Sequence, residues 1–165
     1  MVFVGVDLGL TGAISYLKDT GEVSVIDMPV IKIGKRHDYV VASLVGCFIA
    51  GGPGPMKDLL VGMEALHAMP SSMCSGVGNY SLGRSSGIFE GILAALNIPY
   101  QKIPPQRWKK SLLDGLPKEK GSSVVVAKRL FPGVDLSLKR HHGRADSLLI
   151  AEYLRRTCQL GRGEK

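Results

Sequence analysis

Short apolar runs separated by polar turns open the chain and predict three neighbouring strands. They cover residues 2–7 (VFVGVD), 12–17 (GAISYL) and 22–28 (EVSVIDM). Their short polar connections are typical of an antiparallel meander. Two later apolar runs, residues 59–64 (LLVGME) and 99–103 (PYQKI), also have the length and composition of strands.

Apolar residues at helical spacing predict helices between and after these strands. The predicted helices are residues 38–50, 81–97, 122–131 and 143–158, and a helix that starts with the prolines of PPQRWKKSLL. Asp38 is the candidate N-cap of the first helix, and proline is favourable in the first turn of a helix. The order of elements indicates an α/β domain with a mixed sheet of about five strands, flanked by helices.

The segment around the third helix combines a long loop with a regular spacing of glycines. Residues 67–80 are rich in Ser, Gly and Met and predict a loop. Gly83, Gly87 and Gly91 lie four residues apart, on one face of the predicted helix 81–97. We expect this face to pack closely against the sheet.

The length of 165 residues predicts one domain, which we assign to residues 1–158, followed by a basic, flexible tail at 159–165. No apolar run is long enough to span a membrane, and the first residues do not resemble a signal peptide. Three widely spaced cysteines fit neither a disulfide framework nor a zinc site. We therefore expect a reducing intracellular compartment: a bacterial or phage-host cytoplasm, or a chloroplast or mitochondrion if a transit peptide has been removed.

The net charge of +7 is distributed unevenly along the chain. Residues 1–100 carry 6 basic and 8 acidic residues (−2), whereas residues 101–165 carry 15 basic and 6 acidic residues (+9). This asymmetry predicts a polyanion-facing surface in the C-terminal part of the fold. A solvated basic face without a partner is the alternative.

Three carboxylates stand at the ends of apolar segments, where acidic residues are otherwise sparse. Asp7 ends the first predicted strand, Glu64 ends the fourth, and Asp146 lies in the first turn of the last predicted helix. If the fold brings them together, they repel one another unless a divalent cation neutralises them, and oxygen ligands favour Mg²⁺ or Mn²⁺ over zinc. The alternative assigns them separately to a turn, a surface loop and a helix N-terminus.

Two histidines precede the third carboxylate. His142 lies four residues before Asp146, so both side chains project from one helix face. It could bind a metal or hold the attacking water of a hydrolysis reaction, and a structural or surface histidine is the alternative. For the neighbouring His141 the structural interpretation is favoured.

Three motifs, VGVDLGLTGA, VGMEALHAMP and HHGRADSLLIAEY, occur in this order across nearly the whole chain. Together they resemble the RuvC-type Holliday junction resolvases, which are ribonuclease H-like endonucleases. The segment GRSSGIFEGILAALNIPYQKIPPQRWKKSLL is also similar to the corresponding part of phage and organellar members, including the chloroplast resolvases. The resemblance implies a ribonuclease H-like fold.

The resemblance also implies an activity and a metal site. The implied activity is that of a Mg²⁺-dependent crossover junction endodeoxyribonuclease, which resolves four-way DNA junctions by paired symmetric nicks in recombination and repair. Asp7, Glu64 and Asp146 match the metal ligands, and two Mg²⁺ or Mn²⁺ ions are expected in each active site. Some members carry an acidic residue where this chain has Gly143, and His142 is expected to replace it as a ligand.

A catalytic lysine and a homodimer are further implications of the resemblance. A lysine is expected in the loop before residue 122, where Lys120 is preferred to Lys118 and a solvated turn lysine is the alternative. The homodimer would pair through the helix at residues 81–97 and match the two-fold symmetry of a junction. Trp108 is interpreted as a core anchor rather than a base-stacking residue.

Basic residues of the C-terminal part are expected to track the DNA phosphates, and the loop after Glu64 to enter the centre of the junction. The residues expected to bind DNA are Arg107, Lys109, Lys110, Lys118, Lys128, Arg140, Arg144 and His67. Two alternatives remain open. One is another ribonuclease H-like nuclease that acts on RNA–DNA hybrids or branched DNA, and the other is a junction-binding module without catalysis.

Overall fold

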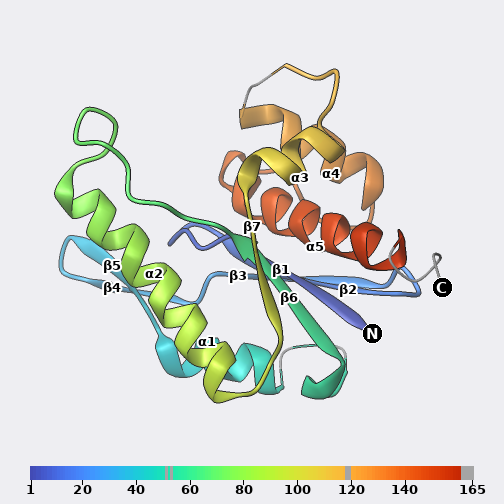
Figure 1. The fold of residues 1–165 in the computed structure, drawn as a ribbon, viewed down its shortest axis with the longest axis horizontal. Coiled ribbons are helices and arrows are strands. Elements are labelled where there is room, and N and C mark those ends of the chain that lie inside the picture. Colours follow the sequence, from blue (N-terminus) through green and yellow to red (C-terminus); the bar gives the residue numbers. More distant parts are fainter. Residues whose placement is uncertain (51, 53, 118–119, 161–165) are drawn as a thin grey trace.

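Five strands form one mixed sheet in the order β3-β2-β1-β6-β7 (Figure 1). The computed structural model describes residues 1–50, 52, 54–117 and 120–160. In the sheet, β1 pairs antiparallel with β2 and parallel with β6. The predicted meander and the mixed five-stranded sheet are thus confirmed. The strands are β1 (Val2–Val6), β2 (Ala13–Lys18), β3 (Val23–Asp27), β6 (Leu59–Glu64) and β7 (Tyr100–Ile103).

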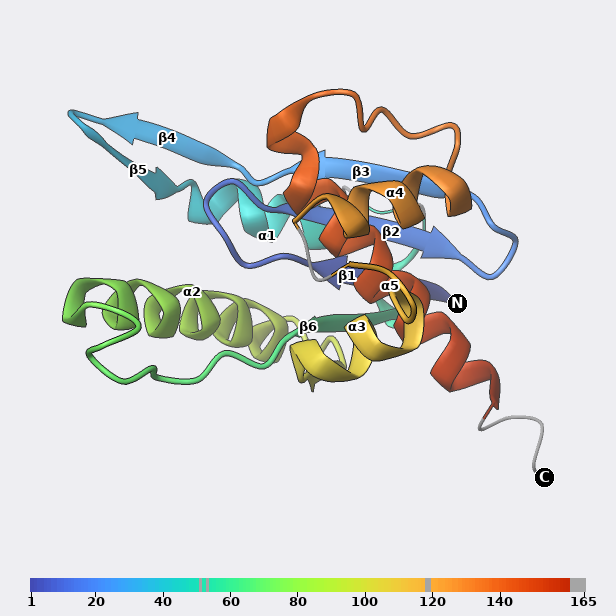
Figure 2. The same ribbon diagram turned by 90° about the horizontal axis from the view of Figure 1, so that it is seen from above.

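Helices cover both faces of this sheet (Figures 1 and 2). They are α1 (Val41–Ile49), α2 (Gly76–Ala95), α3 (Pro105–Leu112), α4 (Lys120–Leu130) and α5 (His142–Leu160). Because side chains point alternately to the two faces of a sheet, β1 contributes residues to a hydrophobic core on each face. Its Val4 packs in the core beneath α1 and α2, and its Phe3 in the core beneath α3, α4 and α5.

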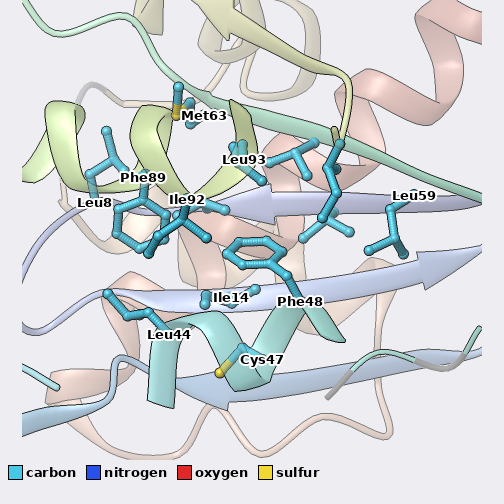
Figure 3. Packing of buried hydrophobic residues seen from close by; sticks show 14 of the residues in the cluster. Leu8, Ile14, Leu44, Cys47, Phe48, Leu59, Met63, Phe89, Ile92 and Leu93 are labelled. Carbon is cyan, nitrogen blue, oxygen red and sulfur yellow. The ribbon is translucent and has the colours of Figure 1, made fainter. Parts of the chain in front are cut away.

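Aromatic side chains hold α1 and α2 together over the sheet. Figure 3 shows Phe48 of α1 beside Phe89 of α2, and their ring centroids lie 6.3 Å apart in an edge-to-face arrangement. Leu44 and Leu93 pack in the same core and are fully buried. Edge-to-face contact adds to the stability that burial itself provides.

Helix α5 lies directly on β1 because β1 carries a glycine at the point of contact. A Cβ atom at Gly5 would lie 1.9 Å from the carbonyl oxygen of Ser147 and 2.5 Å from the amide nitrogen of Ala151. Only glycine permits this approach. This close packing brings the beginning of α5 to the carboxyl end of β1.

A separate two-stranded hairpin, β4 (Val30–Ile33) and β5 (Arg36–Tyr39), projects beside the main sheet (Figure 2). The sequence analysis missed it and began a helix at Asp38 instead. That N-cap prediction is wrong, because Asp38 lies within β5 and α1 is capped by Val40 without a side-chain hydrogen bond. The alternation of Ile31 and Ile33 with lysines, before a turn at Gly34 (φ 61°), is a local signal for such a hairpin.

Helix α2 begins inside the segment that was predicted as a loop. Its first residue is Gly76, and the Ser75 hydroxyl caps it by accepting the amide of Gly78 at 3.1 Å. Helix α4 likewise begins at Lys120, two residues before the predicted start. Both differences concern helix ends, where local preferences are weakest.

The glycine face of α2 does not pack against the sheet, so that prediction is wrong. Gly83, Gly87 and Gly91 are exposed, and a Cβ atom placed on any of them would meet no atom within 4 Å. The helix instead buries a different stripe, which includes Phe89 and Leu93. The glycine face is therefore open within one copy of the chain.

None of the described helices is both long and apolar enough to cross a membrane. Helix α5 continues to Leu160, two residues beyond the end predicted for the domain. The rest of the predicted tail, residues 161–165, lies outside the described residues, and the domain boundary stays a prediction.

Candidate active site

The carboxyl ends of β1 and β6 lie side by side and bring two acidic residues together. Val6 of β1 is opposite Met63 of β6 in a parallel pair. Asp7 follows Val6, and Glu64 is the last residue of β6. The two carboxylates interact electrostatically, since Glu64 raises the pKa of Asp7. The expected convergence at one sheet edge is observed.

The first turns of α5 add the third carboxylate. An isolated bridge between Gly12 and Gly143 joins the start of α5 to the end of the turn that follows β1. Asp146 lies one turn further along α5, and its charge raises the pKa of both Asp7 and Glu64. All three predicted carboxylates therefore share one site.

Position 143, where some members of the resembled family carry an acidic residue, is a glycine in close contact with the turn after β1. A Cβ atom there would lie 2.5 Å from the carbonyl oxygen of Thr11, 2.6 Å from the Cα of Gly12 and 3.0 Å from Oδ2 of Asp7. A side chain at position 143 would therefore require α5 or the turn after β1 to shift. His142 is the neighbouring polar group, and it lowers the pKa of Asp146 through its charge.

All three carboxyl groups are held in surroundings that disfavour their charge. Burial raises the pKa of Asp7 to about 6, against the weaker lowering effect of the Gly9 amide. Burial also raises the pKa of Glu64 and of Asp146. The ammonium of Lys109 lowers the pKa of each of the three. A cluster of buried carboxylates of this kind is stabilised by a bound cation.

Neighbouring groups orient the carboxylates. The Gly9 amide donates to Oδ1 of Asp7 at 3.2 Å. The fully buried indole of Trp108 donates from Nε1 to Oε1 of Glu64 at 3.1 Å. Ser123, at the beginning of α4, forms a hydrogen bond with the Asp146 side chain.

Two further buried polar atoms of the site have no hydrogen-bond partner in the part of the chain that the structure describes. They are Oδ1 of Asp146 and Nδ1 of His142. Buried polar atoms are normally satisfied, so an unpaired oxygen and an unpaired ring nitrogen on one helix face indicate a missing ligand.

The donor set fits a hard divalent cation. It offers carboxylate oxygens and one imidazole, without thiolates, which suits Mg²⁺ or Mn²⁺. In the described residues no three His, Cys, Asp or Glu side chains are close enough together to hold one ion by themselves. This spacing is compatible with Mg²⁺, which commonly takes one or two carboxylates and completes its shell with water and substrate phosphate.

A cleft of about 730 Å³ opens beside Asp7 and Glu64. Its walls are the turn after β1, the β4–β5 hairpin and the N-terminal half of α2. Arg36, His37 and Arg84 line these walls. The Arg84 guanidinium is paired with Asp38, which also lines the cleft, so the walls carry the charge of Arg36 beside the acidic end formed by Asp7 and Glu64. A cation beside the carboxylates suits a phosphate-bearing substrate.

Most of the basic residues expected to bind DNA are exposed on the helices beside the site. Arg107, Lys109 and Lys110 are exposed on α3, Lys128 is exposed near the end of α4, and Arg140 is exposed just before α5. No DNA is present to test these assignments, which stay predictions. His67 is also exposed, directly after β6.

Arg144 differs from the other predicted DNA ligands, because its charge is already engaged. Its guanidinium makes two hydrogen bonds to the Asp27 carboxylate, at 2.5 and 2.7 Å, and a third to the carbonyl of Asp135. Lys118 lies outside the described residues. Lys120 is the first residue of α4, and its side chain also lies outside the described part.

Sequence reasoning missed two contributions of α3 to the site. Trp108 was interpreted correctly as a core anchor, but its hydrogen bond to Glu64 was not foreseen. Lys109 was assigned to DNA only, although its ammonium acts on all three carboxylates and lies 5.1 Å from the centre of the Trp108 ring. The available signal was that the predicted helix of PPQRWKKSLL directly follows the predicted strand at residues 99–103.

No family model matches the sequence. A stretch of 76 residues, 45% of the chain, is 40% identical to part of the chloroplastic Holliday junction resolvase MOC1 of Chlamydomonas reinhardtii. The matched part is only 9% of the length of that relative.

The fold matches solved structures of RuvC from Thermus thermophilus along nearly its whole length. The complex of RuvC with a Holliday junction substrate has a TM-score of 0.64 at 16% identity, covering 98% of this chain and 96% of that one. A second RuvC structure has a TM-score of 0.59 at 17% identity, covering 98% and 97%. These matches confirm the ribonuclease H-like fold and the resemblance to RuvC-type resolvases that the three motifs predicted.

Proposed function

We propose that this chain is a RuvC-type Holliday junction resolvase, an endonuclease that cuts four-way DNA junctions by paired symmetric nicks. The observation that carries the proposal is the meeting of Asp7, Glu64 and Asp146 at one edge of a ribonuclease H-like sheet. The similarity of 76 residues to a chloroplast junction resolvase supports the choice of substrate.

We assign metal-assisted phosphodiester hydrolysis as the reaction. Asp7, Glu64, Asp146 and His142 would hold Mg²⁺ or Mn²⁺ in a two-ion arrangement. Bound ions would supply an activated water and neutralise the charge of the phosphate.

The side chains of this protein have separate tasks in that reaction. Trp108 keeps one oxygen of Glu64 in a fixed direction. His142 is our candidate to orient or deprotonate the attacking water, supported by its buried, unpartnered Nδ1. Lys109, whose ammonium already acts on the carboxylates, is a candidate to stabilise the negative charge that develops on the phosphate, beside Lys120.

DNA binding and dimerisation complete the proposal. The net charge of +7 and the exposed cations of α3 support contacts to phosphates, which give sequence-independent affinity. Two symmetric cuts need two sites related by a two-fold axis, and the open glycine face of α2 supports pairing of two copies there. The relative from a chloroplast supports an organellar setting.

The decisive experiment is nicking of a labelled four-way DNA junction in Mg²⁺, beside a linear duplex and an RNA–DNA hybrid. We expect paired cuts in the junction alone, and no cuts with Asp7→Asn. Cutting of the hybrid instead would favour another ribonuclease H-like nuclease. Tight binding to the junction without cutting, in Mg²⁺ and in Mn²⁺, would leave a binding module and refute the nuclease.

A further inference from the structure

Two neighbouring residues of β5 tie the β4–β5 hairpin to the body of the protein. The Asp38 carboxylate accepts two hydrogen bonds from the Arg84 guanidinium of α2, at 2.6 and 3.1 Å. The Tyr39 hydroxyl is buried, where it donates to the carbonyl oxygen of Leu8 at 2.5 Å and lies 2.7 Å from Oγ of Ser85. The hairpin is thus fastened to α2 and to the turn after β1 at one place.

Leu8 directly follows Asp7, so its carbonyl belongs to the turn that directs the Asp7 carboxylate. Three other hydrogen bonds hold the same turn: the Gly9 amide donates to Oδ1 of Asp7 at 3.2 Å, the Gly12 amide to the Gly9 carbonyl at 2.8 Å, and the Asp7 amide to the Ala13 carbonyl at 3.0 Å. None of them pairs the Leu8 carbonyl. If the donor to Leu8 were removed, a buried carbonyl would lose its partner, and the turn would shift to regain one.

The number of hydroxyl protons decides which group holds the turn. Tyr39 and Ser85 have one proton each, and the Leu8 carbonyl can only accept. Tyr39 therefore gives its proton to Leu8, while Ser85 donates either to Tyr39 or to the carbonyl of Ser81, at 2.7 and 2.9 Å. Loss of the Ser85 hydroxyl leaves the bond to Leu8 intact, whereas loss of the Tyr39 hydroxyl deletes it.

We propose that Tyr39 is a positioning residue for Asp7: its hydroxyl holds the Asp7 turn through the Leu8 carbonyl, and the Asp38–Arg84 pair keeps Tyr39 in place. This inference rests on the proposed nuclease function. The Tyr39 side chain is only 7% exposed, and its hydroxyl is buried, so it acts through the turn and not by contact with DNA. Its loss therefore affects the rate of cleavage and leaves the affinity for the junction unchanged.

The first test compares Tyr39→Phe with Ser85→Ala, which removes a hydroxyl from the same buried cluster without touching the Asp7 turn. Single-turnover cleavage of a bound junction is measured in Mg²⁺, and junction affinity is measured in Ca²⁺. We expect Tyr39→Phe to slow cleavage about ten-fold, the rate equivalent of one hydrogen bond, with affinity within about two-fold of wild type. Ser85→Ala should cut at close to the wild-type rate.

A second readout needs neither DNA nor metal. The backbone amide of Gly9 donates to Asp7, so its NMR chemical shift and its hydrogen exchange report on the turn. We expect both to change in Tyr39→Phe and to stay near wild type in Ser85→Ala. Thermal denaturation of both variants establishes that each is folded.

The ion pair is tested by a charge swap. We expect Asp38→Arg and Arg84→Asp to slow cleavage separately, and the double variant, in which the pair is reversed, to cut faster than either single variant. Recovery is only partial, because the Tyr39 amide also donates to Oδ1 of Asp38 at 2.7 Å and loses this acceptor in the double variant. If the reversed pair is as slow as the single variants, the Asp38–Arg84 pair does not position Tyr39.

Failure of this inference can be told apart from failure of the proposed function. A wild-type protein that cuts junctions, together with an equally fast Tyr39→Phe variant, would overturn the positioning role alone. Equal slowing by Tyr39→Phe and Ser85→Ala would indicate general loosening of the cluster and would also overturn it. A wild-type protein that cuts no junction would refute the proposed junction cleavage, and the Gly9 amide would still decide whether Tyr39 holds the turn.

Discussion

At the scale of single residues, the buried carboxylates of the site carry a cost when they ionise. Burial raises the pKa of Asp7 from its ordinary value of 3.8 to about 6. Between these values the folded protein binds more protons than the unfolded chain, so stability falls as the pH rises through this range. Above about pH 6 the full cost is present, and a bound cation offsets it.

The cost at Asp7 predicts an unusual effect of a mutation that removes activity. We expect Asp7→Asn to abolish cleavage and yet to raise the free energy of unfolding of the metal-free protein by about 3 kcal/mol near neutral pH. The gain should narrow as the pH falls below about 6 and vanish below 3.8, where Asp7 is protonated in both the folded and the unfolded state. Urea denaturation in EDTA at several pH values measures this difference. Equal stability of the two proteins at neutral pH would show that burial does not disfavour the charge.

Trp108 offers a second test at this scale, because its indole holds Glu64. We expect Trp108→Phe to raise the Mg²⁺ concentration for half-maximal cleavage several-fold and to weaken Mn²⁺ binding to the DNA-free protein, since one oxygen of Glu64 loses its donor. Leu112→Val, which trims another buried residue of α3, is the matched control. An equal loss of metal affinity in both variants would assign the effect to core packing.

At the scale of elements, the site depends on how closely α5 approaches β1 and the turn after it. Gly5 permits the contact along the strand, and Gly143 permits the bridge at the helix start. These contacts bring Asp146 from one element to Asp7 and Glu64 on two others. A small displacement of α5 therefore separates the third carboxylate from the first two.

Gly143 tests this dependence directly. We expect Gly143→Ala to reduce the free energy of unfolding by about 1–3 kcal/mol, because its Cβ would overlap backbone atoms that cannot move aside. The rate of cleavage should fall even under conditions where the variant is folded, because a shift of α5 also displaces Asp146. Gly133→Ala is the control, as a Cβ there would meet nothing within 4 Å. Urea denaturation and junction cleavage measure the two effects. A Gly143→Ala protein that is as stable and as active as wild type would show that the site does not require this close contact of α5.

At the scale of the whole molecule, one copy of the chain leaves the glycine face of α2 open. An exposed face of small residues allows another helix to approach closely. The proposed dimer uses this face, which lies on the opposite side of the sheet from the basic helices α3 and α4 (Figure 1). Pairing there would leave the cations of α3 free to contact DNA.

The dimer gives a prediction of its own. We expect Gly87→Glu to yield monomers in sedimentation experiments and to replace paired cuts by single, uncoupled nicks, because two buried like charges would face each other across the two-fold axis. Gly46→Glu on α1 is the control, since Gly46 is exposed and has open space around it in the same way. A Gly87→Glu variant that still forms dimers would show that the interface does not lie on the glycine face of α2.

The amino-acid sequence by itself determined the central strands, most of the helices and the three carboxylates. The run VFVGVD shows both a buried strand and the acidic residue that ends it, because burial of apolar residues and the spacing of side chains act over a few neighbouring positions. The ribonuclease H-like fold was implied by the resemblance of the three motifs, in their order, to RuvC-type resolvases. These features depend on short segments that can be recognised one at a time.

Only the tertiary structure decided which partners complete those segments. Asp38 has the local character of an N-cap, yet it binds Arg84, 46 residues away, from within a strand. The contacts of Tyr39 with Leu8 and of Trp108 with Glu64 span 31 and 44 residues. Such hydrogen bonds depend on the path of the whole chain, and no periodic pattern encodes them. The tertiary structure likewise decided that the glycine face of α2 is exposed, because contacts with the core determine which side of the helix is buried.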